Sequence, residues 1–222
     1  MRDSSIGSLY NARPMKTDFE QINQTLGFNP AALIEWALKL EPQALCTTNF
    51  GPFSPVLLHM VTRVRPDLPI LWVDHGYATP ANYQFADEVT KLLKLNLKIY
   101  HPLRSRAHRE AVEGSVVPGL DHPERHAVFT QEVKLEPFAR ATRELAPKLW
   151  LTAVRADQTA ERAAMKPVSL DSKGIIKVAP LLQWSSKDMH EYLKKHGLPN
   201  NFDYFDPTKV EENRECGLHT IA

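Results

Sequence analysis

One cysteine near the end of the chain has the surroundings of a reactive thiol. Cys216 lies in the run RECGLHT, within a polar stretch that offers little apolar sequence for it to pack against. The thiolate is the nucleophilic form of cysteine; Arg214 and His219 would favour it, whereas Glu215 would disfavour it. We therefore predict that Cys216 is reactive, and that Cys46, inside an apolar run, is buried and inert.

Three polar runs elsewhere have residue types suited to binding a phosphorylated ligand. TTNFGPFS, at 47–54, combines hydroxyls, a glycine and backbone N–H groups at the start of an expected helix, which favours a phosphate cradle. In DHGYATP, Asp74 could accept a hydrogen bond from a sugar hydroxyl or an amine, and Gly76 would allow close approach of the backbone. In RADQTAER, Arg155 and Arg162 could grip anionic oxygens in a bidentate manner.

Each run also has an interpretation without a ligand. TTNFGPFS lacks the Walker pattern and could be an ordinary turn between a strand and a helix. Asp74 could cap the helix that follows it, and the two arginines could be solvated helix residues. Spacing alone leaves both interpretations open.

The elements that position these runs alternate along the chain. Capping residues and apolar periodicity predict helices, and short uncharged apolar runs predict buried strands. Residues 114–126, rich in proline and glycine, are expected to form a loop, and 166–180 a small hairpin. The expected helices are 30–41, 54–64, 80–95, 129–145 and 185–195, and the expected strands are 43–50, 69–74, 97–102 and 148–154.

This alternation predicts an α/β fold with a doubly wound, mostly parallel sheet. In such sheets ligands bind beyond the carboxyl ends of the strands, near the point where the strand order reverses, and the three polar runs each follow an expected strand. We expect an N-terminal extension over 1–28, one nucleotide-binding domain over 29–198, and an extended C-terminal arm over 199–222 that carries Cys216.

Composition argues against several classes of protein. The 27 basic and 26 acidic residues leave no global charge for nucleic acid or an anionic membrane surface. No signal-peptide core and no apolar run long enough to span a membrane is present, so a cytoplasmic protein is expected. Two distant cysteines exclude a disulfide framework and a cluster held by four thiolates of one chain. His122 and His126 lack a further ligand at a matching offset, so no metal is expected.

Several motifs in a fixed order carry a resemblance to a known family. The motifs are TTNFGPFSPVLLH, RPDLPILWVDHGYATPANYQFADEV, KLEPFARA, WLTAVRADQTAER, KVAPLLQW, YLKKHGLP and ECGLH. In these motifs, from about residue 30 to residue 220, the chain resembles the phosphoadenosine phosphosulfate and adenosine phosphosulfate reductases of assimilatory sulfate reduction. The ECGLH motif is the most specific part of the match.

The resemblance implies an adenine nucleotide α-hydrolase-like sheet that binds an adenosine phosphosulfate. It implies that Cys216 attacks the sulfonate sulfur, that His219 assists the thiolate or contacts phosphate, and that thioredoxin or glutaredoxin then frees sulfite. A homodimer is also implied. The positions that match the family's substrate-binding motifs are Thr48, Gly51, Ser54, Asp74, Gly76, Lys134, Arg155, Arg162 and, in the tail, Arg214.

The resemblance also bears on the substrate. Family members that use the unphosphorylated nucleotide usually carry additional cysteines that hold a four-iron cluster, and these cysteines are absent here. The 3′-phosphorylated nucleotide and a cluster-free enzyme are therefore favoured, with a cluster-free reductase of adenosine 5′-phosphosulfate as the alternative. The segment between YLKKHGLP and ECGLH is shorter than in the family, so Lys209 and Arg214 are candidates to supply missing contacts.

Two other classes stay open at this point. ATP pyrophosphatases that adenylylate a substrate share the expected fold, but the SGGxDS loop is absent and the tail cysteine would have no role. A non-catalytic nucleotide-binding or redox-sensing protein could use Cys216 only to report oxidation. Transfer of a sulfonate to Cys216 would separate the reductase from both.

Overall fold

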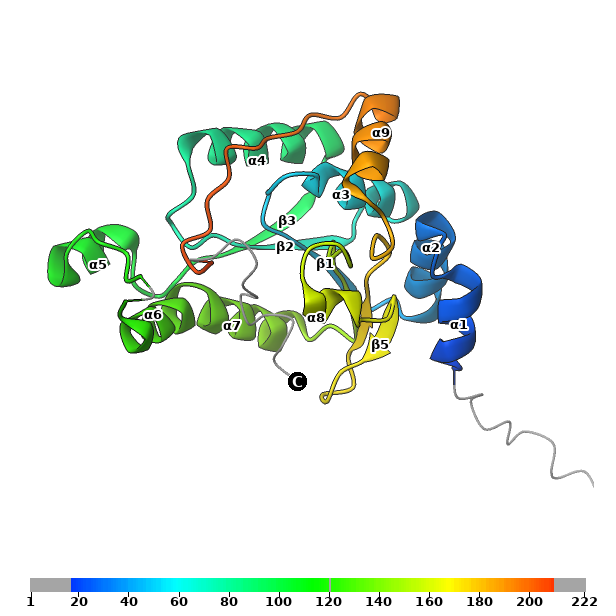
Figure 1. Ribbon diagram of the computed structural model, residues 1–222, viewed down its shortest axis with the longest axis horizontal. Helices are drawn as coiled ribbons and strands as arrows, with labels where there is room; N and C mark the ends of the chain where they lie inside the picture. The colour runs from blue at the N-terminus through cyan, green and yellow to red at the C-terminus, as the bar shows by residue number, and fades with distance from the viewer. Residues whose placement is uncertain (1–16, 120, 210–222) are drawn as a thin grey trace, which may run out of the picture.

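Six short strands form one sheet whose order reverses at its centre. The computed structural model describes residues 17–119 and 121–209 (Figure 1). The order across the sheet is β3-β2-β1-β4-β6-β5, and every pair is parallel except β5 with β6. This confirms the predicted doubly wound, mostly parallel sheet. The strands are β1 (Ala44–Thr48), β2 (Pro69–Val73), β3 (Asn96–Tyr100), β4 (Leu149–Leu151), β5 (Val168–Leu170) and β6 (Ile176–Val178).

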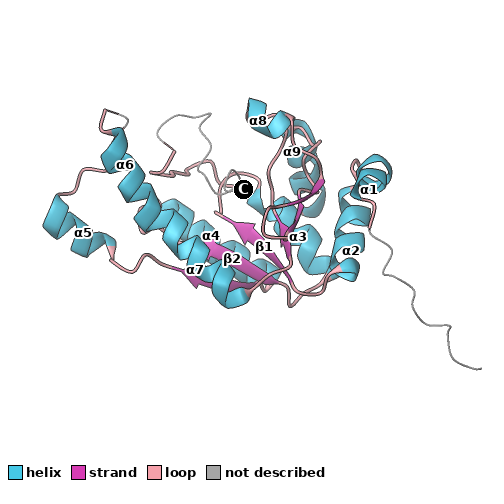
Figure 2. Cartoon of the chain, turned by 90° about the horizontal axis from the view of Figure 1, so that it is seen from below, coloured by secondary structure: helices cyan, strands magenta, loops and turns pink. Residues whose placement is uncertain are grey.

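Helices cover both faces of this sheet (Figures 1 and 2). One large core packs α2, α3, α4 and α9 against one face, and a smaller core packs α7 against the other. The helices of the described chain are α1 (Phe19–Leu26), α2 (Pro30–Leu40), α3 (Ser54–Val64), α4 (Pro80–Leu93), α5 (Arg106–Glu113), α6 (Pro123–Thr130), the π-helix η1 (Gln131–Leu135), α7 (Glu136–Leu145), α8 (Ala160–Ala163) and α9 (Ser186–His196).

Local signals set most of the boundaries, as predicted. Asn29 caps α2 through its side chain and Pro30 occupies the first turn, where a missing N–H costs nothing. A capping box at Ser185 and Asp188 begins α9, and Gly197, in the left-handed conformation with φ 62°, ends it. The hairpin β5–β6 also forms as expected.

The alternation of side chains along β1 explains the burial of one cysteine. Ala44 and Cys46 face the larger core, and Leu45 faces the smaller one. Cys46 is 0% exposed, and burial raises the pKa of its thiol well above the ordinary value. The prediction that this cysteine is buried is confirmed.

Other expectations were wrong in part. The expected loop over 114–126 ends early, because Pro123 begins α6, and α6, η1 and α7 run on as one continuous helical stretch to Leu145. Helices α1 and α5 had no counterpart in the sequence analysis. Helix α1 packs at β5, where Asn23 exchanges two hydrogen bonds with the backbone of Val168 (3.0 and 2.7 Å).

None of the helices in the described ranges is long and apolar enough to cross a membrane.

Candidate functional site

A cavity of about 320 Å³ opens at the point where the strand order reverses. The chain leaves β1 toward β2 on one side, and β4 returns on the other side of β1, so the loops after β1 and β4 border a common hollow. Side chains from η1 and from residues 204–209 complete its wall. The lining residues are Thr47, Thr48, Asn49, Gly51, Pro52, Phe53, Ser54, Leu57, Leu58, Lys134, Thr152, Ala153, Val154, Arg155, Gln158, Arg162, Met189, Tyr204, Asp206 and Lys209.

The loop after β1 is held in an unusual conformation by a buried aromatic ring. Phe50 and Phe53 have φ values of 50° and 65°, which non-glycine residues rarely adopt. Phe50 is fully buried, with its ring edge-to-face on Trp72 at 5.0 Å, and its carbonyl accepts a hydrogen bond from the Asn82 side chain (2.7 Å). The loop is therefore fixed where Ser54 begins α3.

Backbone N–H groups of this loop are paired with side chains of the protein itself. Thr48 Oγ1 accepts from the N–H of Phe50 (3.1 Å), and Asn49 Oδ1 accepts from the N–H of Gly51 (3.0 Å). The free N–H groups expected at these two positions are therefore occupied locally, as in an ordinary turn. Ser54 Oγ differs: it is buried at the cavity wall and has no partner in the described structure, so it is available to a ligand oxygen.

The two arginines after β4 both contact the side chain of Gln158. The backbone N–H of Arg155 donates to Gln158 Oε1 (3.1 Å), and the guanidinium of Arg162 donates to the same oxygen. Both arginines are 7% exposed, which is contrary to the interpretation of solvated helix residues. Arg155 also donates to Asp157 and Ser186, at 3.1 and 3.2 Å. Two positive side chains therefore line one wall at fixed places.

A third cation, Lys134, comes from the π-helix η1 and is already paired. Its Nζ donates to Asp206 Oδ2 (2.5 Å) and to Thr208 Oγ1 (2.9 Å). Burial opposes ionisation of Asp206, but the ammonium of Lys134 and the hydrogen bonds from Lys134 and Thr208 lower its pKa to about 2. The two charged groups are 8% and 6% exposed, so they form a buried ion pair at the cavity wall.

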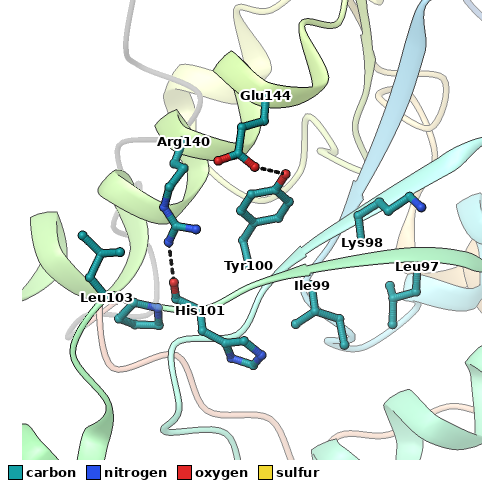
Figure 3. Close-up of a pocket in the computed structure, with 9 residues that line it drawn as sticks. Leu97, Lys98, Ile99, Tyr100, His101, Leu103, Arg140 and Glu144 are labelled. Carbon is teal, nitrogen blue, oxygen red and sulfur yellow. Dashed lines mark hydrogen bonds between the residues drawn. The ribbon is translucent and has the colours of Figure 1, made fainter.

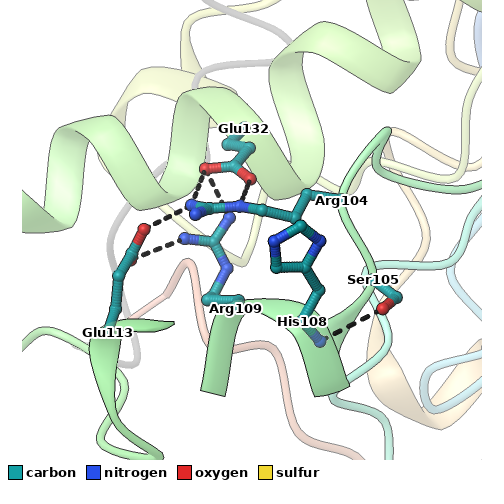
Figure 4. A network of polar contacts seen from close by, with 6 residues as sticks. All are labelled: Arg104, Ser105, His108, Arg109, Glu113 and Glu132. Atoms are coloured by element: carbon teal, nitrogen blue, oxygen red, sulfur yellow. Dashed lines mark hydrogen bonds and ion pairs between the residues drawn. The ribbon is translucent and has the colours of Figure 1, made fainter. Parts of the chain in front are cut away.

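A second ionic network fixes η1 from its other side (Figure 4). Glu132 accepts from Arg104 Nε (2.8 Å) and pairs with Arg109 (2.5 Å), and Glu113 contacts both arginines. Hydrogen bonds from Arg104 lower the pKa of Glu132 to about 2. Because Glu132 lies on the same turn as Lys134, this network holds the turn that presents the lysine.

Asp74 and Gly76 do not line the cavity in the described structure. The Asp74 carboxylate accepts from the N–H of Gly76 (2.9 Å) and from the hydroxyl of Tyr83 (2.7 Å). Gly76 has φ 81°, which the turn after β2 requires and which favours glycine. Thr79, not Asp74, caps α4. Asp74 therefore organises this turn through its own contacts.

His75 lies beside the turn as a neutral side chain. It is 9% exposed, and its Nδ1 accepts from the N–H of Tyr77 (3.0 Å). Burial lowers the pKa of His75 below its ordinary value. An acceptor Nδ1 and a lowered pKa both favour the neutral ring.

A second hollow, of about 630 Å³, lies at the open edge of the sheet along β3 (Figure 3). Tyr100 donates to Glu144 (2.8 Å), and Arg140 donates to the carbonyl of His101 (2.6 Å). None of the predicted site residues lines it. Within the described ranges, no group of three or more histidine, cysteine, aspartate or glutamate side chains is placed to hold a metal ion.

The predicted residues thus divide into three groups. Thr48, Gly51, Ser54, Lys134, Arg155 and Arg162 line one cavity, although they come from separate runs of the sequence. Asp74 and Gly76 lie at a neighbouring turn. The three predicted tail residues, Arg214, Cys216 and His219, lie outside the described residues.

Sequence reasoning missed four residues at this site. Gln158 stands between the two arginines in RADQTAER, and that position was the available signal. Asn200, Tyr204 and Asp206 lie in a stretch that the sequence analysis treated as an arm. Their pairing with residues far back in the chain has no signal in the local sequence.

Comparisons with known proteins show which family the chain resembles in sequence. A model of the phosphoadenosine phosphosulfate reductase domain matches residues 43–205. Phosphoadenosine 5′-phosphosulfate reductase of Synechocystis sp. is 41% identical over 175 residues, which cover 78% of this chain and 69% of that protein. The enzyme of the same name from Klebsiella pneumoniae is 34% identical over 210 residues, with 84% of each chain covered.

Solved structures show the same fold. The phosphoadenylyl-sulfate (PAPS) reductase of Candida auris, a phosphate complex, has a TM-score of 0.71 and 26% identity and covers 82% of this chain and 87% of its own. FMN adenylyltransferase of Candida glabrata (TM-score 0.53, 16% identity, 78% and 56% covered) and NAD synthetase of Campylobacter jejuni (0.51, 12%, 84% and 76%) share the fold alone. The predicted adenine nucleotide α-hydrolase-like fold is confirmed.

Proposed function

The chain belongs to the phosphoadenosine phosphosulfate reductase family, and from this premise we propose that it reduces 3′-phosphoadenosine 5′-phosphosulfate to sulfite and adenosine 3′,5′-bisphosphate. Thioredoxin is the proposed electron donor, with glutaredoxin as the alternative dithiol. The physiological role would be assimilatory sulfate reduction. The observation that carries the proposal is the cavity at the reversal of strand order, where Lys134, Arg155 and Arg162 converge.

The described residues support binding of a polyanion. Guanidinium groups bind phosphate and sulfonate oxygens through paired N–H donors, and Arg155 and Arg162 offer two such groups at one wall. Ser54 Oγ adds an unpaired hydroxyl at the first turn of α3, where the helix dipole also favours negative charge. These groups would hold the phosphosulfate while its terminal sulfur is attacked.

The proposed reaction has two steps that balance. The Cys216 thiolate attacks the sulfonate sulfur, the bond between that sulfur and the bridging phosphate oxygen breaks, and adenosine 3′,5′-bisphosphate leaves with the electron pair. A thioredoxin thiolate then attacks the Cys216 sulfur and expels sulfite, leaving a mixed disulfide. The second thioredoxin thiol resolves this disulfide. Thioredoxin is thus oxidised, the substrate sulfur is reduced by two electrons, and Cys216 returns as a thiolate.

The cysteine content supports an external dithiol and no iron–sulfur cluster. The chain has two cysteines, and a cluster held by four thiolates of one chain needs twice as many. Cys46 is fully buried on β1, so its thiol is not accessible to attack an adduct on Cys216. A homodimer and a cytoplasmic location stay predictions from the resemblance and the sequence.

Sulfite release tests the function directly. The pure protein is mixed with 3′-phosphoadenosine 5′-phosphosulfate and reduced thioredoxin, and sulfite is measured over time. We expect turnover with this nucleotide, little turnover with adenosine 5′-phosphosulfate, and none with Cys216→Ser. Turnover of the unphosphorylated nucleotide alone would favour the alternative substrate, and no sulfite from either nucleotide would reject the reductase.

A further inference from the structure

Residues 200–209, which we call the strap, follow α9 and cross the carboxyl edge of the sheet without forming a helix or strand (Figure 1). Polar contacts hold the strap to separate loops. Thr79 Oγ1 donates to the carbonyl of Asp203 (3.0 Å), and Asn49 Nδ2 donates to the hydroxyl of Tyr204 (2.7 Å). The strap therefore bridges the loops that follow β1 and β2, next to the cavity.

Two strap side chains occupy donors that an anionic ligand would use. Asn200 Oδ1 accepts from the N–H of Phe53 (2.8 Å), in the loop that leads into α3. Asp206 Oδ2 accepts from Lys134 Nζ (2.5 Å). Phe53 and Lys134 both line the cavity, so oxygens of the strap lie where phosphate or sulfonate oxygens would bind.

The charge of Asp206 opposes a bound polyanion. Asp206 is the one carboxylate among the described residues that line this cavity, whereas Lys134, Arg155, Arg162 and Lys209 are cations. A carboxylate that stayed beside Lys134 would repel the substrate and would satisfy donors that the substrate needs. The Lys134–Asp206 pair therefore suits the empty site and not the occupied one.

In the structure the strap lies against the cavity, which we call its closed position. The contacts that hold it there can be replaced by a ligand at a small cost in free energy. In a buried ion pair, the loss of solvation of both ions offsets most of their attraction, so replacing Asp206 by another anion costs little. Asn200 Nδ2 is buried and has no partner within the described structure. The closed position therefore carries an unsatisfied donor that release of the strap would return to water.

Resting on the proposed function, we propose that the strap is an autoinhibitory contact that the substrate displaces. In the empty site, Asp206 holds Lys134 and Asn200 holds the backbone N–H of Phe53. The anionic groups of 3′-phosphoadenosine 5′-phosphosulfate replace both oxygens and free the strap.

Binding measurements test the displacement. All proteins carry Cys216→Ser, so that no sulfonate is transferred, and 3′-phosphoadenosine 5′-phosphosulfate is titrated by calorimetry. We expect Asp206→Asn to bind the nucleotide about tenfold more tightly, because the competing carboxylate is gone and a larger fraction of the protein is open. Asp203→Asn is the matched control, since it removes the same charge from an exposed position of the strap, and we expect unchanged affinity.

Proteolysis gives a second measurement of the strap itself. Chymotrypsin cleaves after Phe202 and Phe205, which are 65% and 49% exposed. We expect the nucleotide to speed cleavage in the parent protein, and Asp206→Asn to be cleaved as fast without nucleotide. Asn200→Ala is expected to shift both measurements in the same direction, and it replaces Asp206→Asn should that variant not fold.

The possible outcomes distinguish failure of the strap proposal from failure of the proposed function. Equal or weaker binding by Asp206→Asn and Asn200→Ala, or protection of the strap by the nucleotide, would show that the strap does not inhibit, while the reductase proposal would stand. A parent protein that binds no 3′-phosphoadenosine 5′-phosphosulfate would overturn the substrate proposal and the strap with it.

Discussion

Arg155 and Arg162 lie buried at the wall of the cavity, whereas the Asp74 carboxylate is used within the turn after β2. Arg155 and Arg162 follow a predicted strand, and the structure buries both beside the cavity. Asp74 also follows a predicted strand, but its carboxylate is used by the N–H of Gly76 and by the Tyr83 hydroxyl, which come from the next turn and helix. Residue type and position predicted a donor or acceptor, while the partner was set by packing between elements.

The geometry of Arg155 predicts that lysine cannot replace it. Arg155→Lys keeps the charge but loses the planar set of donors that contacts Asp157 and Ser186 and faces the cavity. We expect the KM for 3′-phosphoadenosine 5′-phosphosulfate to rise by roughly 10-fold or more, because the substrate loses one charge-assisted hydrogen bond. Steady-state sulfite release measures this. Arg143→Lys, an exposed change on α7, is the control, and an equal effect of the two variants would contradict the role of Arg155.

At the scale of elements, boundaries with a local chemical signal were predictable and others were not. Asn29 with Pro30, and Ser185 with Gly197, gave α2 and α9 correctly. The π-helix η1 has no comparable signal, because an extra residue in a helical turn changes the hydrogen-bond register without requiring a particular side chain. The expected helix 129–145 contains η1, but its π-helical register was not predicted, and this turn presents Lys134 to the cavity.

The ionic network on η1 predicts that the Glu132 carboxylate contributes strongly to the free energy of unfolding. Glu132→Gln removes the charge that pairs with Arg109, a guanidinium only 5% exposed, and we expect a loss of about 2 to 3 kcal/mol in the free energy of unfolding. Glu110→Gln breaks the more exposed pair with Arg106 on α5 and is expected to cost about 0.5 kcal/mol or less. Urea denaturation measures the free energy of unfolding of both variants. Similar losses would show that the buried network stabilises the fold no more than an exposed ion pair does.

At the scale of the whole molecule, the sheet order places the site. The sequence predicted parallel strands and a site beyond their carboxyl ends, but it did not give the order β3-β2-β1-β4-β6-β5 that brings the loops after β1 and β4 together. That order depends on pairing between strands far apart in the chain. The contacts of the strap could not be predicted for the same reason, because Asp206 and Lys134 are far apart in the sequence and come into contact only in the folded chain.

Three buried or paired groups predict how stability of the whole fold depends on pH. Burial lowers the pKa of His75 from 6.5, and the pKa values of Glu132 and Asp206 fall to about 2 from 4.5 and 3.8. In each case the unfolded chain binds the proton more readily, so stability is lost as pH falls. We expect Tm to decline below pH 6.5 and more steeply below pH 4.5. A Tm that is constant or rises between pH 6.5 and 3 would contradict these assignments.

Transfer of a sulfonate to Cys216 is measured directly by the intact mass of the protein after incubation with 3′-phosphoadenosine 5′-phosphosulfate in the absence of reductant. We predict one added sulfonate, located at Cys216 by peptide mapping, retained in Cys46→Ala, absent from Cys216→Ser, and removed by reduced thioredoxin with release of sulfite. No adduct on a protein that binds the nucleotide would contradict the account and leave a nucleotide-binding protein without this sulfonate-transfer chemistry.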